Sequence, residues 1–230
     1  QSEDGIRASV ASCGVGDVYK RRNATQIIGL TFFNGRVHNN WPGGGSLVLD
    51  RSTNIQFVNC VFDSNRVTDN NAGGAIDIRG QATPSFTGCT FINNYAWDLD
   101  SEQRGGAIAI GSASSATDLA NAINFKQTKF IGNYVKAKQS SEGGAIYTNR
   151  NTVFENCLFI KNGAIAGEGA STNTYESSRG GAIYSAPPRF LASGCLVLDV
   201  RPLAETPMGE CATHGSARVR GEGIVDRMPD

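Results

Sequence analysis

Short runs in which every second residue is apolar recur along the chain. Alternation with a period of two is typical of β-strands, because successive side chains of a strand point to opposite faces. The three-residue step from Phe57 to Cys60 shifts the alternation, so the chain must bend there if both side chains face inward. The pattern predicts three short strands per unit, which in one unit carry Ile55 and Phe57, Cys60 and Phe62, and Ile76 and Ile78.

The unit returns in four successive copies. Each copy has a Phe, a second Phe five residues later, an Asn three residues after that, and then a Gly-Gly-Ala-Ile tetrapeptide. The second Phe and the Asn are Phe62 and Asn65, Phe91 and Asn94, Phe130 and Asn133, and Phe159 and Asn162. The tetrapeptides begin at Gly73, Gly105, Gly143 and Gly180. A less regular copy lies between Ile27 and Leu49, and a last one retains Cys195 and Val197.

Repetition at a period of roughly 30 to 40 residues predicts a solenoid, in which each unit buries its apolar face against the next. Short strands joined by bends are what a coil of a parallel β-helix requires. We therefore expect an all-β chain with a β-helix over residues 25–200. Residues 1–24 are expected to form an N-terminal lead-in or cap, and residues 201–230 a C-terminal cap or a flexible tail.

Equivalent residues of a parallel β-helix lie above one another, because neighbouring strands are about 4.8 Å apart. The repeats then predict three interior rows that form the core. The first aromatic row is Phe57, Phe86, Phe125 and Phe154, and the second is Phe32, Phe62, Phe91, Phe130 and Phe159. The aliphatic row is Leu47, Ile76, Ile108, Ile146 and Ile183.

The recurrent Asn and Gly residues have structural explanations. An Asn just after a strand tolerates left-handed backbone and can bond the turn, and stacked Asn amides can bond along their column. A Gly-Gly pair predicts a corner where φ is positive, or where two backbones approach too closely for a Cβ.

The cysteines divide into two groups. Cys60, Cys89 and Cys157 occupy one position of successive repeats, where Leu30 and Thr128 also occur. A free Cys behaves as a small hydrophobic residue at such a site, so we expect a buried stack that includes Cys195. Cys13 and Cys211 lie outside the pattern, and a disulfide between Cys195 and Cys211 remains an alternative in an oxidising compartment.

The connection between the Asn and the Gly-Gly pair varies most in length from repeat to repeat. The pattern predicts loops that leave the same corner of every coil and line up along one edge. Because binding residues are often carried by loops on a rigid scaffold, this edge is the predicted binding site.

Charge and hydropathy restrict the partners. The chain carries 21 basic and 21 acidic side chains, so no net field attracts nucleic acid, and we expect no nucleic-acid partner. It contains no apolar run of about 18 residues, so no transmembrane segment is predicted.

The two repeated tetrapeptides, Phe-x-x-Asn and Gly-Gly-Ala-Ile, resemble the repeats of the chlamydial polymorphic outer membrane proteins and, more broadly, right-handed parallel β-helix proteins of the pectate-lyase-like group. The resemblance covers roughly residues 25 to 185. It implies an all-β, single-stranded right-handed parallel β-helix (solenoid) of about six coils. The group includes surface adhesins, autotransporter passengers, polysaccharide lyases and epimerases.

We expect a non-catalytic scaffold for adhesion or assembly, placed outside the cell or on its surface, that binds a protein or a polysaccharide through the predicted edge. One alternative is a carbohydrate-active enzyme, a polysaccharide lyase or an epimerase. A second alternative is an accessory subunit bound within a larger protein complex.

The enzyme alternative has one candidate site. Polysaccharide lyases of this fold use clustered carboxylates to hold calcium and a basic residue to abstract a proton. The densest such cluster is Asp98, Asp100 and Glu102, followed by the basic residue Arg104. Arg104, and Trp97 before the cluster, are also candidate binding residues of the predicted edge. Its alternative is a solvated polar loop beside an ordinary strand surface that carries Asp77 and Arg79, and no other cofactor is expected.

A pair of tyrosines is a second candidate for binding. Tyr147 and Tyr184 occupy equivalent positions of successive repeats, one residue after the inward Ile of the tetrapeptide, so both are expected to be exposed. Neighbouring exposed aromatic rings can stack on a sugar ring or pack against a protein, and the alternative is that they only cover the surface.

Overall fold

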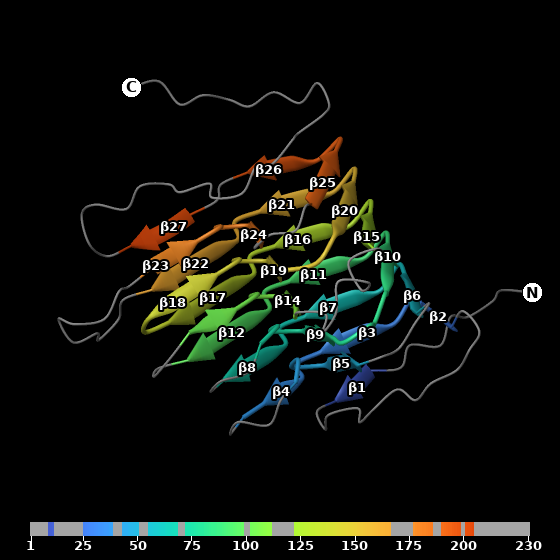
Figure 1. Ribbon diagram of the computed structural model, residues 1–230. Coiled ribbons are helices and arrows are strands. Elements are labelled where there is room, and N and C mark those ends of the chain that lie inside the picture. The colour runs from blue at the N-terminus through green and yellow to red at the C-terminus, as the bar shows by residue number, and fades with distance from the viewer. Residues whose placement is uncertain are drawn as a thin grey trace, which may run out of the picture.

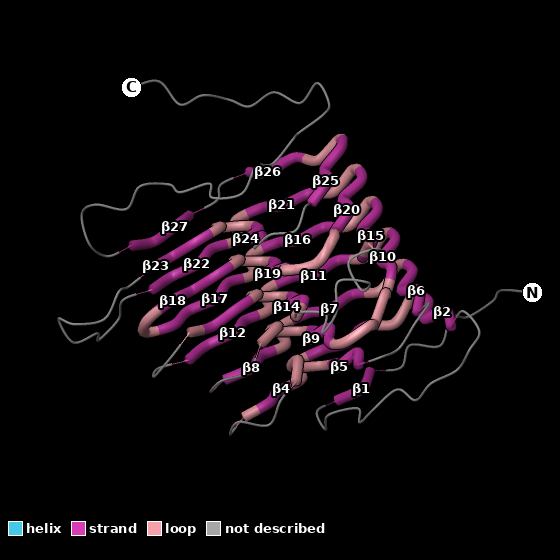
Figure 2. Tube along the Cα trace, in the orientation of Figure 1, coloured by secondary structure: helices cyan, strands magenta, loops and turns pink. Residues whose placement is uncertain are grey.

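The structure is a computed structural model that describes residues 9–11, 25–38, 43–50, 55–68, 72–98, 102–111, 122–166, 177–185, 190–198 and 201–204. In these residues the chain consists of strands and turns without a helix, as Figure 2 shows. Every described strand pairing is parallel, and the strands form five sheets. The expected all-β class is therefore confirmed.

Three sheets, here named A, B and D, carry the interior rows. Sheet A contains β1 (Ser9–Ala11), β3 (Thr31–Phe33), β7 (Val61–Asp63), β11 (Thr90–Ile92), β16 (Lys129–Ile131), β21 (Leu158–Ile160) and β26 (Leu196–Leu198). Sheet B contains β2 (Thr25–Ile28), β6 (Ile55–Val58), β10 (Ser85–Thr87), β15 (Ile123–Lys126), β20 (Thr152–Glu155) and β25 (Phe190–Ser193). Sheet D contains β5 (Leu47–Asp50), β9 (Ile76–Arg79), β14 (Ile108–Ile110), β19 (Ile146–Thr148) and β24 (Ile183–Ser185).

Two further sheets, C and E, are built from the connections of variable length. Sheet C contains β4 (Arg36–Val37), β8 (Arg66–Thr68), β12 (Tyr95–Asp98), β17 (Tyr134–Ala137), β22 (Gly163–Ala166) and β27 (Arg201–Ala204). Sheet E contains β13 (Gln103–Arg104), β18 (Ser140–Glu142) and β23 (Ser177–Arg179).

The chain visits the sheets in the same order in every repeat. It runs through sheets B, A and C, then through sheet E in the later repeats, and then through sheet D before it enters sheet B of the next repeat. Each strand therefore pairs with its equivalents in neighbouring repeats, and the colours of Figure 1 change step by step along the stack. These long parallel stacks fit a β-helix solenoid. The prediction of three strands per repeat is wrong, because sheet C supplies a fourth strand and sheet E a fifth.

The predicted interior rows are present. In the first aromatic row, neighbouring ring centroids from Phe57 to Phe154 lie 4.9 to 5.1 Å apart with nearly parallel planes. The second row, from Phe32 to Phe159, has spacings of 4.6 to 5.0 Å. Rings of the two rows meet edge to face, a geometry that contributes about 0.5–1.5 kcal/mol per pair beyond burial. The aliphatic row is also in register, and all three rows belong to one core.

The cysteine position also forms a column in this core. The thiols of Cys60, Cys89 and Cys157 are buried and free, and each donates to a backbone carbonyl of the preceding repeat. The hydroxyl of Thr128 donates in the same way to Phe86, 3.3 Å away. The position therefore takes a small side chain with a weak donor, which explains why Cys and Thr exchange there. Cys195 is free but only partly buried, so it extends the column without being enclosed.

The Asn residues form a hydrogen-bonded column. Each side-chain amide donates to the Oδ1 atom of the next Asn, at 3.0 Å from Asn65 to Asn94, 2.9 Å from Asn94 to Asn133 and 3.0 Å from Asn133 to Asn162. Each amide also donates to the carbonyl of a Phe in the preceding repeat, such as Phe91. The expected left-handed backbone lies one residue earlier, at Ser64, Asn93, Gly132 and Lys161.

The two glycines of each Gly-Gly pair have different roles. The first has a positive φ, between 63° and 76° in Gly73, Gly105, Gly143 and Gly180. The second lies where backbones touch: a Cβ on Gly106 would overlap the carbonyl oxygen of Gly144 and the backbone of Tyr134. Tyr134 begins a strand of sheet C, so this glycine forms a narrow neck at which the chain leaves the main core and later returns.

The segment beyond the neck is a two-layer arm rather than the predicted set of loops. The chain leaves along sheet C and returns along sheet E, and the two sheets contact each other. The inner side of sheet C forms a small second core of Val67, Ala96, Val135 and Ala164, all with no exposed surface. The strands of the arm form backbone hydrogen bonds with their equivalents in neighbouring repeats, and these bonds hold the arm in its shape.

Residues near the ends continue the sheets. Strand β1 pairs with β3, and β27 pairs with β22. Strand β27 lies within the segment 201–230 that was expected to be a cap or tail. Cys13, Cys211 and residues 205–230 lie outside the described residues, so the domain boundaries at 24 and 200 stay a prediction.

We predict that Asn133→Ala lowers the free energy of unfolding by about 1–3 kcal/mol for each buried group left without a partner. The substitution orphans the Phe91 carbonyl and the backbone and side-chain N–H groups of Asn94. Urea unfolding measures the loss. Asn124→Ala is the matched control, because the Asn124 amide is exposed and bonds only locally to Ala122; equal losses in the two variants would contradict a role of the column.

We also predict that Gly106→Ala costs about 3 kcal/mol or more, because a Cβ at the neck has no space. Gly111→Ala is the control, since its Cβ would meet nothing nearer than the Ile78 carbonyl oxygen at 3.6 Å. The control is expected to change stability by no more than about 0.5 kcal/mol. Thermal unfolding of both variants gives the comparison, and a stable Gly106→Ala protein would argue against a closed neck.

Candidate functional site

A row of charged residues runs across the outer side of sheet E. Arg104, Glu142 and Arg179 each precede a Gly-Gly pair directly, and they are in register on β13, β18 and β23. Their neighbours point into the arm: the Ser141 hydroxyl donates to Ile165, and the Ser178 hydroxyl accepts from the Ala166 amide at 2.8 Å. Strand alternation therefore turns the three charged side chains outward.

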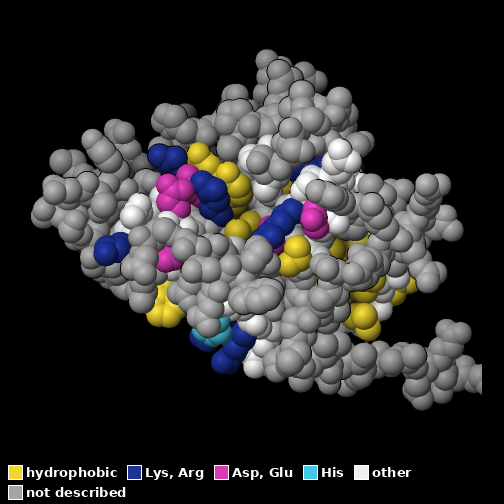
Figure 3. All heavy atoms as spheres, turned by 60° about the horizontal axis from the view of Figure 1, so that its bottom comes forward, with side chains coloured by type: hydrophobic (Ala, Val, Ile, Leu, Met, Phe, Trp, Pro, Cys, Tyr) yellow, Lys and Arg dark blue, Asp and Glu magenta, His cyan; other side chains and the backbone are white. Residues whose placement is uncertain are grey.

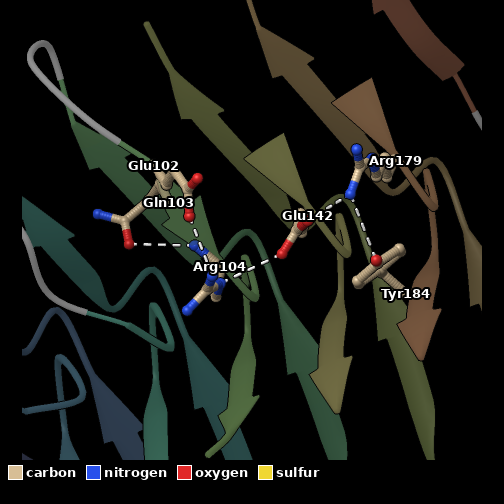
Figure 4. Close-up of polar contacts among 6 residues, drawn as sticks. All are labelled: Glu102, Gln103, Arg104, Glu142, Arg179 and Tyr184. Carbon is tan, nitrogen blue, oxygen red and sulfur yellow. Dashed lines mark hydrogen bonds and ion pairs between the residues drawn. The ribbon is translucent and has the colours of Figure 1, made fainter. Parts of the chain in front are cut away.

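Ion pairs link the row, as Figure 4 shows. Glu142 accepts from Nε of Arg104 at 3.1 Å and from Nη1 of Arg179 at 3.2 Å. Glu102 pairs with Nη2 of Arg104 at 2.9 Å. The side chain of Glu142 is only 9% exposed, whereas those of Arg104 and Arg179 are 44% and 47% exposed. Glu142 is thus an inner anchor that positions two arginines at the surface.

Two tyrosines of sheet D complete the site. Tyr147 and Tyr184 are in register on β19 and β24, and their ring centroids are 5.8 Å apart. The Arg104 guanidinium lies 5.0 Å from the centroid of the Tyr147 ring, and that of Arg179 lies 5.9 Å from Tyr184. Guanidinium groups in such positions are attracted by the ring face. We name the set of Glu102, Arg104, Glu142, Tyr147, Arg179 and Tyr184 the Arg104 face.

The electrostatics of the Arg104 face follow from these contacts. Burial raises the pKa of Tyr147, and the Arg104 cation opposes that rise. Burial alone would lower the pKa of Arg104, but Tyr147 and Glu142 more than offset it and raise that pKa. The hydrogen bond with Tyr184 raises the pKa of Arg179. Both arginines therefore stay charged over the whole range in which proteins are folded.

The structure brings together three of the predicted binding residues, Arg104, Tyr147 and Tyr184. The expected exposure of Tyr147 is wrong: it is 8% exposed, because Arg104 and Tyr184 cover its ring. Tyr184 remains half-buried. Of this aromatic pair, Tyr184 is the ring that an outside molecule can reach.

Trp97 lies elsewhere. It is on β12, two residues from Tyr95, whose ring is 6.3 Å from that of Trp97 and 4.1 Å from that of Tyr134. Because Ala96 points into the second core, Trp97 points to the outer side of sheet C, across the arm from Arg104. Trp97 is therefore not part of the Arg104 face.

The calcium candidates are distributed differently from the expected polar loop. Asp98 ends strand β12 and is 3% exposed, on the same side of the strand as Ala96. Glu102 pairs with Arg104, and Asp100 lies outside the described residues. Among the described residues, no group of three or more His, Cys, Asp or Glu side chains could hold a metal ion. A calcium site that uses Asp100 stays a prediction.

The nearby strand surface is also more buried than expected. Asp77 on β9 points away from the main core, yet it is 3% exposed and pairs with Arg79. Burial raises its pKa, and Arg79 counteracts that shift. Asp77 is two repeats from Tyr147 in the same outward column of sheet D.

Sequence reasoning missed Glu142 and Arg179, although a signal was present. In three successive repeats the residue directly before Gly-Gly is charged, and its sign alternates from Arg104 to Glu142 to Arg179. Tyr95 and Tyr134 were missed as well, although each directly follows an Asn of the column. Figure 3 shows basic and acidic side chains beside one another on one face of the molecule, with hydrophobic side chains among them.

Comparisons with known proteins add no assignment. The chain matches no protein-family model, and searches of curated proteins and of solved structures found no match. The described residues include no helix long and apolar enough to cross a membrane.

The arrangement can bind an anionic group. A guanidinium has five N–H donors, and the pairs with Glu142 and Glu102 use the Nε and Nη2 atoms of Arg104. Each arginine also carries a ring on its inner side, so its position is fixed before a ligand arrives. Arg104 and Arg179 each lie one strand away from the carboxylate of Glu142, which both of them contact. Two cations held at this fixed spacing suit a ligand with regularly spaced negative charges.

We predict that Arg104→Met raises the pKa of Tyr147 further, because the cation that stabilises the phenolate is lost while burial remains. Spectrophotometric titration of phenolate formation measures the shift. The same titration in Tyr147→Phe variants assigns the signal, since the chain has 6 tyrosines. A lower pKa in Arg104→Met would show that Arg104 does not act on the Tyr147 ring.

Proposed function

We propose that this chain is a non-catalytic scaffold that acts outside the cell or on its surface and binds an acidic polysaccharide in adhesion. Its fold in this proposal is a single-stranded, right-handed parallel β-helix of about six coils, the architecture that the repeat pattern favours. The proposal rests on one observation, the Arg104 face with its two arginines held outward by Glu142 and by tyrosine rings.

The rigidity of the site supports binding. Every residue of the Arg104 face except Glu102 lies on a strand that pairs with its equivalents in other repeats. A pre-organised site loses little conformational entropy on binding, so a larger part of its contact energy appears as affinity. Glu102 is 55% exposed, so a ligand could displace this carboxylate of the Arg104 face from Arg104.

The spacing of the arginines supports a linear ligand. Arg104 and Arg179 are separated by one intervening strand, which places their backbones about 9.6 Å apart along the stack. An extended polymer with a carboxylate on each sugar ring can meet both cations at once. The ring of Tyr184 beside Arg179 offers a flat surface to the sugar.

The test is titration calorimetry with polygalacturonate as the acidic polymer and dextran as the neutral one. We predict that Arg104→Gln/Arg179→Gln weakens binding of polygalacturonate at least about tenfold, because hydrogen bonds between charged groups contribute about 1.5–3 kcal/mol each. Lys126→Gln/Lys129→Gln removes the same charge from sheets B and A and is expected to retain most of the affinity.

The outcomes separate the proposal from its competitors. Equal weakening in both double variants would indicate unspecific attraction, and no binding by the unchanged protein would exclude an acidic polysaccharide of this kind. Formation of unsaturated uronate products, with or without added calcium, would replace the scaffold with a lyase.

A further inference from the structure

Two cysteines of the column lie directly opposite each other in the last two repeats. The amide of Asn156 donates to Ser193 at 2.9 Å, and the amide of Leu196 donates to Cys157 at 3.0 Å. These bonds flank Cys157 and Cys195, so the two residues occupy the same register position of neighbouring repeats. Cys195 packs against the main core, and Cys157 belongs to it.

This register satisfies the backbone requirement of a disulfide. Neighbouring parallel strands are about 4.8 Å apart, and the two Cα atoms of a disulfide are usually about 4.4–6.8 Å apart. Both thiols are free, and both point to the same interior column. The Cβ atoms of a disulfide are usually about 3.5–4.5 Å apart, so closing the bond requires an approach of roughly 1 Å from the strand spacing.

A second pair with the same register provides a comparison within the chain. Cys60 and Cys89 are flanked by the bonds from Asn59 to Thr87 and from Thr90 to Cys60, both 2.9 Å. Neither of these two thiols has any exposed surface, whereas Cys195 is partly exposed. An oxidant can therefore reach Cys195 in the folded protein, but it cannot reach Cys60 or Cys89.

The surroundings of Cys195 also allow movement. It lies between β25 and β26, and the side chains of Leu196, Val197 and Leu198 are 44% to 50% exposed. The last described repeat is thus less tightly enclosed than the repeats before it. A local shift that closes a disulfide costs less there than in the middle of the stack.

We propose that Cys157 and Cys195 form a reversible disulfide that fastens the last described repeat to the one before it. This modification is independent of the Arg104 face and of the proposed function.

The chemistry is thiol–disulfide exchange with a small-molecule disulfide such as oxidised glutathione. The thiolate of Cys195 attacks one sulfur of the oxidant, whose S–S bond breaks and releases one thiolate. The thiolate of Cys157 then attacks Cys195 in the mixed disulfide and releases the second thiolate. The two protons of the cysteines pass to the released thiolates, and two electrons pass from the cysteine pair to the oxidant.

The titration of the pair agrees with this order. Contact with Cys157 lowers the pKa of the Cys195 thiol, and the same contact together with burial raises the pKa of Cys157. Cys195 is also the thiol of the pair that the oxidant can reach, so its exposure sets the order of the two attacks.

The experiment uses the full chain with Cys211→Ser, so that linkage to that residue cannot confuse the assignment. The folded protein is incubated with oxidised glutathione, alkylated and mapped by mass spectrometry without reduction. We expect a linked peptide that contains Cys157 and Cys195, reversed by dithiothreitol, while Cys60 and Cys89 stay reduced. Adding Cys195→Ser should abolish the link, and circular dichroism confirms that each variant folds.

Three results would overturn the proposal. Cys157 and Cys195 could remain reduced, Cys195 could keep glutathione because Cys157 does not attack it, or Cys60 and Cys89 could be oxidised first. Hydrogen exchange of β25 and β26 tests the fastening: exchange should slow in the oxidised protein, and unchanged rates would show that the bond does not hold the repeat.

Discussion

Register between successive repeats is the constraint on which the rest of this structure depends. Parallel pairing sets each residue beside its equivalent, so a slip of one residue would turn every inward side chain outward. The aromatic rows resist such a slip through stacked rings, and the Asn column resists it through directional bonds that exist in only one alignment. Both devices link only neighbouring repeats, so each repeat is positioned by the one beside it.

The neck at the Gly-Gly corner is a consequence of the same register. A Cβ on the second glycine would overlap the glycine of the next repeat and the start of sheet C, so the chain closes the main core before the arm begins; this holds at Gly45, Gly74, Gly106 and Gly144. The arm then has its own small core, and its length can vary without disturbing the aromatic rows. This separation explains how connections of very different length occur in one regular stack.

The sequence predicts the interior well and the arm poorly, and the reason is physical. The interior rows repeat with fixed spacing, so Phe62, Phe91, Phe130 and Phe159 identify one another, and the Gly-Gly pairs identify the corner. The arm has no repeated large apolar residue that would identify its strands. Its inner side carries small residues such as Ala96 and Ala164, and its strands differ in length. A polar segment whose length changes from repeat to repeat is therefore predicted to be a loop. In the structure this segment forms strands, because it pairs with the equivalent segments of neighbouring repeats.

The site was predictable only in part, for a related reason. Arg104 and the two tyrosines can each be recognised as candidates from the sequence. The burial of Tyr147 and the role of Glu142 depend on which residues lie side by side in neighbouring repeats. The two arginines that contact Glu142 are 37 and 38 residues from it in the chain. The sequence reveals that these residues are neighbours only when the repeats are aligned at the Gly-Gly pairs, because the segments that form the arm differ in length.

Stacking also restricts which polar residues a repeat can reuse. A neutral Asn can recur at one position of every repeat, because its amide donates on one side and accepts on the other. A charged residue recurs at a cost, since two like charges one strand spacing apart repel by about 3–4 kcal/mol at an effective dielectric constant of about 20. The exposed Arg36 nevertheless lies in register with Arg66. In two other columns the signs alternate, from Arg104 to Glu142 to Arg179 and from Lys126 to Glu155. At the Arg104 face this alternation places two partly exposed cations on either side of a buried anion.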